Sequence, residues 1–184
     1  MKTVAACAMF MGAAVLFGLQ GKAMAEPMKP PAEVVQVQPQ AVLSGRSTLR
    51  VLGLAIYDAR LWVSRDFALP SYVQHPFALE LQYQRSLKGR LIAQRSLAEM
   101  RRQRDFPEPQ ATTWGEQMQA LFPDVGPGDR ITGEYLPGSG ARFWFNGRLL
   151  GEVRDAQFAK LFFGIWLSPE TSEPQARCAL AACS

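Results

Sequence analysis

The sequence predicts an α+β fold, in which a large antiparallel sheet carries helices packed on one face. Two observations lead to this class. Segments with strand periodicity are joined by tight-turn residues, and the helical segments fall into separate blocks. The predicted order is strands, two helices, three strands and one helix, without the strand–helix–strand alternation of a parallel sheet. The sequence indicates neither an internal repeat nor a second domain.

Residues 1–25 have the features of a secretory signal peptide. Lys2 precedes the apolar run Val4–Leu19, and an Ala-Met-Ala cleavage sequence ends at Ala25. The apolar run is shorter than the roughly 20 residues of a membrane span. We therefore expect an exported, periplasmic protein that is cleaved after Ala25, with an uncleaved membrane anchor as the alternative. Cleavage removes Lys2 and Lys22 and lowers the formal charge from +4 to +2, so the charge says little about partners.

The N-terminal half is predicted to supply the first strands. Residues 26–42 are Pro-rich and are predicted to form an extended lead-in, in which Val34–Val37 is a candidate to join the sheet edge. Gly45–Val63 is predicted to form one long central strand. Phe77–Gln84 alternates between apolar and polar residues, as expected of a strand with one buried face.

Two helices are predicted next. Ser86–Arg104 lacks proline and is rich in helix-forming residues. Its many arginines predict a solvated face, with contact to an anionic membrane surface or ligand as the alternative. Thr113 and Glu116 have the spacing of a capping box, which predicts that the second helix starts at Thr113 and stops at Pro123.

The C-terminal half is predicted to form a three-stranded meander and a final helix. Asn146-Gly147 is the strongest turn signal, because a type I′ turn requires positive φ at both central residues. In the final helix, Asp155 is the expected cap. The apolar residues that follow are spaced to lie on one helical face, up to the stop at Ser168-Pro169.

The sequence offers little material for metal or nucleophilic chemistry. His75 is the only histidine, and no Cys-x-x-Cys motif is present. We therefore expect no cofactor and no metal. Nucleic acid is not an expected partner, because the aromatic residues of a base-stacking surface are missing. Cys178 and Cys183 can pair with each other, stay free or pair between chains.

Five segments, taken in order, resemble the bacterial, secreted branch of the chalcone isomerase family. They are "GRSTLRVLGLAIYDARLWV", "FALELQYQR", the spacing of the two middle helices, "GDRITGEYLPGSGARFWFNGRLLGEV" and "DAQFAKLFFGIWLS". The resemblance implies an open-faced β-sandwich over residues 43–169, followed by a C-terminal tail at 170–184. Plant members of this family close chalcones to flavanones, and other members are non-catalytic, some of them binding fatty acids.

The resemblance also implies candidate site residues. Arg46 matches the family's arginine, which steadies developing negative charge, and Tyr57 or Asp58 falls where a threonine is expected. Arg46 and Tyr57 are therefore the predicted site residues. The leading hypothesis is a non-catalytic domain that binds a small apolar or acidic ligand, fatty acid-like or aromatic, between sheet and helices. The alternatives are an intramolecular lyase or isomerase of the chalcone type, and an interaction protein with a filled cleft and an unknown partner.

Overall fold

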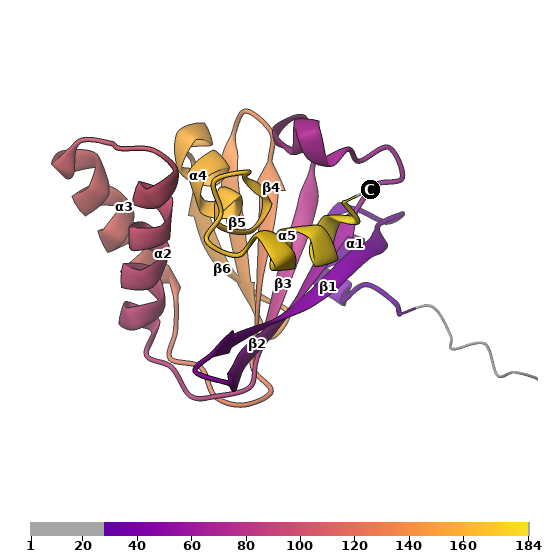
Figure 1. The fold of residues 1–184 in the computed structure, drawn as a ribbon, viewed down its shortest axis with the longest axis horizontal. Coiled ribbons are helices and arrows are strands. Elements are labelled where there is room, and N and C mark those ends of the chain that lie inside the picture. The colour runs from indigo at the N-terminus through magenta and orange to yellow at the C-terminus, as the bar shows by residue number, and fades with distance from the viewer. Residues whose placement is uncertain (1–27, 184) are drawn as a thin grey trace, which may run out of the picture.

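The computed structural model describes residues 28–183, and it confirms the predicted α+β fold (Figure 1). One six-stranded antiparallel sheet has the strand order β1-β2-β3-β4-β5-β6, so each strand pairs with its neighbours in the sequence. The strands are β1 Val42–Val51, β2 Leu54–Val63, β3 Phe77–Tyr83, β4 Arg130–Leu136, β5 Gly140–Phe145 and β6 Arg148–Val153. The predicted signal peptide and its cleavage site lie outside the described residues.

The prediction of one long strand over Gly45–Val63 was wrong, because this stretch folds as the β1–β2 hairpin. The chain reverses at Leu52 and Gly53, whose φ angles are 50° and 77°. Positive φ at both central residues matches the right-handed twist of the paired strands. The other predicted hairpin turn is confirmed, with φ angles of 49° at Asn146 and 84° at Gly147.

Three helices cover one face of the sheet: α2 Gly89–Gln103, α3 Glu108–Leu121 and α4 Ala156–Leu167 (Figure 1). The predicted cap of α4 is confirmed. The Asp155 carboxylate accepts hydrogen bonds from the backbone amides of Gln157 and Phe158, at 2.8 and 3.0 Å. The apolar stripe of α4 then packs into the core, where its phenylalanines contact those of β3 and β5.

The predicted capping box at Thr113 was wrong, because α3 begins five residues earlier, at Glu108. The Thr113 hydroxyl lies inside the helix and donates to the Pro109 carbonyl at 3.0 Å. Proline is well suited to the first helical turn, where its missing amide proton has no helical partner. Pro109 therefore lies in the first turn of this helix and favours its earlier start.

The predicted extended lead-in was also wrong in part, because Ala32–Val37 forms a short helix, α1, on the opposite face of the sheet. The Glu33 side chain is buried and accepts hydrogen bonds from Arg130 and Thr132, at 2.9 Å each. Val34 packs in a small cluster with Trp62 and Ala78. The buried carboxylate and this cluster hold α1 against the sheet, where Val34–Val37 was expected to pair as a strand.

A last helix, α5 Pro174–Ala181, forms within the segment predicted as a tail. It lies against β1, and Leu180 is fully buried there. Cys178 and Cys183 form a disulfide at the end of this helix. Across residues 28–183, every helix is too short or too polar to cross a lipid bilayer.

Candidate functional site

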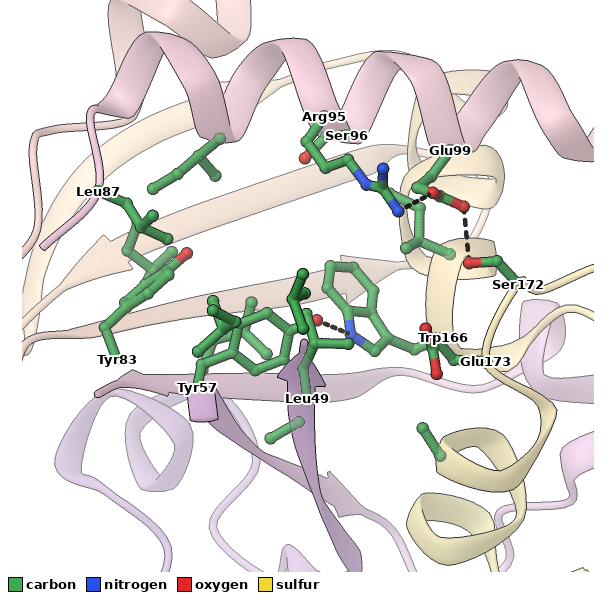
Figure 2. A pocket seen from close by; sticks show the side chains of 18 of the residues that line it. Leu49, Tyr57, Tyr83, Leu87, Arg95, Ser96, Glu99, Trp166, Ser172 and Glu173 are labelled. Carbon is green, nitrogen blue, oxygen red and sulfur yellow. Dashed lines mark hydrogen bonds and ion pairs between the residues drawn. The ribbon is translucent and has the colours of Figure 1, made fainter. Parts of the chain in front are cut away.

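A cavity of about 430 Å³ lies between the β1–β2 hairpin, the neighbouring strands and helices α2, α4 and α5 (Figure 2). This volume falls within the roughly 300–1,000 Å³ of small-molecule sites in proteins. Most of the lining side chains are aliphatic or aromatic, including Leu49, Ile92 and Phe162. The few polar groups therefore decide what else the cavity can bind.

Backbone periodicity brings the lining residues together. Side chains alternate along a strand, so Tyr57 and Ala59 of β2 face the same side as Leu81 and Tyr83 of β3. On α2, residues 92, 95, 96 and 99 follow the i, i+3, i+4, i+7 spacing of one helical face. The cavity thus has a floor of strands and a roof of helix α2, as Figure 2 shows.

Tyr57 lies in the floor of the cavity, where neighbouring side chains hold it in place. Its hydroxyl accepts a hydrogen bond from Trp166 Nε1 at 3.0 Å, and its ring meets Tyr83 edge-on with centroids 6.0 Å apart. Burial raises the pKa of Tyr57 to about 12, and the Trp166 hydrogen bond offsets this only in part. The phenol therefore stays protonated at neutral pH and can donate a hydrogen bond into the cavity, but it is not a general base.

Tyr83 supplies a second hydroxyl to the floor. It makes no side-chain hydrogen bond with any other residue of the part of the chain described here, although its ring is almost completely buried. Burial is the main cause that raises the pKa of Tyr83, and the neighbouring Tyr57 adds to it. Tyr83 is consequently another neutral donor that a ligand can use.

Charged groups gather at the end of the cavity where α2 meets the segment before α5. Arg95 pairs with Glu99 at 2.6 Å, and the Ser172 hydroxyl donates to the other oxygen of Glu99 at 2.9 Å (Figure 2). The Arg95 side chain is 75% exposed, whereas that of Glu99 is only 9% exposed. Arg95 is therefore the accessible member of the pair, and a ligand carboxylate has to compete with Glu99 for it.

The structure separates the two predicted site residues. Tyr57 lines the cavity, but Arg46 is exposed and does not. Arg46 follows Gly45 and precedes Ser47, which does line the cavity, so alternation turns Arg46 to the other face of the sheet. Arg46 lies opposite Arg60, whose guanidinium binds Glu80 at 2.6 Å on that same face.

Sequence reasoning missed Arg95, Trp166 and Tyr83 as site residues. Arg95 lay in a basic stretch predicted to be solvated, and Trp166 and Tyr83 were assigned to apolar core faces. The helical spacing from Ile92 to Glu99 was present in the sequence, but it does not tell which helix face borders a void. In the described range, 28–183, no group of three or more His, Cys, Asp or Glu side chains is arranged to hold a metal ion.

Comparisons with known proteins agree with this fold. Residues 30–180 match the family model described as chalcone isomerase-like. An uncharacterized protein of Haemophilus influenzae is 30% identical over 99 residues, which covers 54% of this chain and 48% of that protein, about half of its length. The crystal structure of the Arabidopsis thaliana fatty-acid binding protein AtFAP1 has a TM-score of 0.59 at 12% identity and matches 77% of this chain and 87% of that one. Because the family model covers most of the chain, the protein belongs to the chalcone isomerase-like family.

Proposed function

We propose that the protein is an exported, non-catalytic member of its family that binds a small apolar molecule in the cavity between the sheet and α2. The observation that carries this proposal is the cavity itself: about 430 Å³ of space with mainly apolar walls and a few hydrogen-bond donors. Such a combination is typical of small-molecule sites, in which apolar walls provide binding energy and a few polar groups fix the orientation.

The polar groups favour binding over catalysis. A chalcone-type ring closure develops negative charge, which needs donors or cations directed at it. Here the guanidinium of Arg95 is paired with Glu99, and Glu99 and Glu173 both border the cavity. Tyr57 is protonated and already bonded to Trp166, which leaves no general base in the floor.

The same groups indicate the class of ligand. An apolar body fits against Leu49, Ile92 and Phe162, while a single carboxylate or hydroxyl head can accept hydrogen bonds from Arg95 or from Tyr83. A fatty acid-like or aromatic acid satisfies both requirements. AtFAP1, which has a similar fold, is named as a fatty-acid binding protein, and this name supports the proposal without carrying it.

Native mass spectrometry of the protein purified from the cells that make it, followed by organic extraction, tests the proposal. We expect a stoichiometric small apolar acid. Arg95→Ala should lower its retention about tenfold, because a charge-assisted hydrogen bond contributes about 1.5–3 kcal/mol. Arg46→Ala is the control, since it removes an exposed arginine from β1, on the face of the sheet turned away from the cavity.

Three outcomes contradict parts of the proposal. An empty protein that binds no added fatty or aromatic acid removes the ligand-binding function. Turnover of chalcones that is lost in Arg95→Ala favours the isomerase alternative. N-terminal sequencing of the same preparation checks export, since we expect the mature chain to begin at Glu26, and an intact Met1 would contradict it.

A further inference from the structure

The tip of the β1–β2 hairpin carries an exposed apolar patch. Leu52 is 96% exposed, and Val51 and Leu54 on either side of the turn are each about half exposed. Leu91 on the first turn of α2 is also about half exposed, and it borders the same cavity as Val51. We call these four residues the apolar tip; Figure 1 shows the hairpin end standing at the edge of the molecule beside the lower end of α2.

Fold stability does not account for the leucine at position 52. Its φ of 50° lies in the left-handed region, which costs most side chains roughly 1–2 kcal/mol and is tolerated best by Gly, Asn and Asp. The β5–β6 hairpin has the same turn with nearly the same angles, and there the residue is Asn146. At position 52 the chain instead places a large apolar side chain in a strained conformation and in contact with water, where it buries almost nothing.

Basic side chains surround the apolar tip. Arg50 lies within the hairpin, and Lys88 and Arg90 flank the start of α2 next to Leu91. Arg85 is brought beside the hairpin because the Gln84 amide donates to the Ile56 carbonyl at 2.8 Å. Of the nearby acids, Asp124 is paired with Lys88, Asp58 accepts hydrogen bonds from Thr48 and Gln84, and Asp129 accepts them from Asn146 and Gly126. These three acids are fewer than the four basic residues named above. The tip therefore has a net positive rim.

We propose that the apolar tip and its basic rim dock onto the surface of an anionic phospholipid bilayer. Exposed leucines enter the boundary between head groups and acyl chains, and each nearby Lys or Arg adds attraction to a negative leaflet. A contiguous apolar patch with a charged rim marks an interaction site, whereas scattered single leucines do not. Because Val51 and Leu91 also line the cavity, the docked face is the one through which an apolar ligand enters; this last step rests on the proposed function.

Vesicle co-sedimentation of the purified protein tests the docking. The probes are vesicles of phosphatidylglycerol mixed with phosphatidylcholine, and vesicles of phosphatidylcholine alone. We expect binding to the anionic vesicles that weakens as salt shortens the Debye length. Leu52→Asn should lower the partition coefficient about tenfold, from the lost burial of one leucine, and Arg90→Gln about fivefold on anionic vesicles only.

Leu149→Asn is the control, because Leu149 is a half-exposed leucine on β6, at the opposite edge of the sheet and away from the apolar tip. All variants share the same N-terminal segment, so any binding through residues 1–27 is common to them and cancels in the comparison. Leu52→Asn should also melt at the same temperature as the wild type or higher, since asparagine suits the turn. A lower affinity for vesicles therefore reports the surface and not the stability of the fold.

Three results overturn the docking proposal: no binding to anionic vesicles, equal binding of the wild type and Leu52→Asn, or a dimer in sedimentation equilibrium that Leu52→Asn dissolves. The dimer would mean that a second copy of the chain covers the tip. An empty cavity combined with binding to vesicles that depends on Leu52 would refute the ligand proposal and leave the docking surface intact. The two proposals therefore fail separately.

Discussion

Gly45→Ala should push α5 about 1 Å away from the sheet without disturbing the rest of β1. A Cβ atom at Gly45 would lie 2.5 Å from the Leu180 carbonyl oxygen and 2.8 Å from its carbonyl carbon, and it would also clash with the Ala179 carbonyl oxygen. All three are backbone atoms, so no side chain can rotate away. The φ of Gly45 is outside the left-handed region, which means that alanine adds no local backbone strain.

The size of the effect follows from how far α5 must move. Restoring an ordinary contact requires a withdrawal of about 1 Å, and a gap of this size already forfeits a quarter to a half of the dispersion energy of the packed atoms. Leu180 is fully buried, and burying a leucine contributes about 1.5–3 kcal/mol. With the added loss of the Arg177 hydrogen bond to the Leu167 carbonyl, at 2.9 Å, we expect the free energy of unfolding to fall by about 2–3 kcal/mol.

Urea denaturation followed by tryptophan fluorescence measures this change. Leu180→Ala is the parallel variant, because it removes the same burial without a clash and should cost about 2–5 kcal/mol. Gly115→Ala is the control for a glycine-to-alanine change at a site where the added methyl group does not clash. Its Cβ would meet Leu97 at an ordinary 3.7 Å, so it should stabilise α3 by about 0.5–1 kcal/mol. If Gly45→Ala unfolds within about 0.5 kcal/mol of the wild type, the close packing of α5 on β1 is refuted.

Three further predictions concern buried polar groups. Burial raises the pKa of Tyr57 and Tyr72 to about 12 from the usual 10.0. The folded protein should therefore keep its full stability below pH 10 and lose stability as the pH rises toward 12. Phenolate absorbance should appear only on unfolding, and separate ionisation near pH 10 would contradict this. Glu33→Gln should lower the free energy of unfolding, measured by denaturant titration, by about 2 kcal/mol, because it removes the ion pair between Arg130 and α1. An unchanged denaturation midpoint would mean that α1 contributes nothing to stability. Trp166→Phe should lower the free energy of unfolding by about 1 kcal/mol more in the wild type than in a Tyr57→Phe background, because only the wild type has the Tyr57 hydrogen bond to lose; equal losses would contradict this bond.

The elements that sequence reasoning predicted well are those with strong local signals. Asn146-Gly147 fixes a hairpin turn, and Asp155 followed by a long apolar stripe fixes the start and the buried face of α4. These features depend only on residues that are close together in the sequence. The hairpin at Leu52 escaped prediction for the opposite reason, since a leucine in the left-handed region contradicts the usual residue preference of the turn.

The candidate site could be predicted only in part. The alternation in β2 placed Tyr57 on the buried side, and that residue does line the cavity. Arg46 was assigned from the resemblance, and the structure places it on the face of the sheet turned away from the cavity, because it alternates with Ser47 along β1. Arg95 and Glu99 come together with Ser172, which lies more than seventy positions later in the chain. Such a contact depends on tertiary packing, which no local pattern encodes.

The position of α5 at the end of the chain affects how the sheet is completed during folding. Strands β1 to β6 pair in sequence order, so the sheet can grow strand by strand from the N-terminal end of the chain. The face of β1 at Gly45, however, is covered by Ala179 and Leu180, so the first strand waits for the C-terminal helix before this face is closed. During that interval the N-terminal edge of the sheet is open to chaperones. A chain that stops short of Leu180 leaves this face of β1 uncovered, so we expect proteases to cleave it faster than the complete chain.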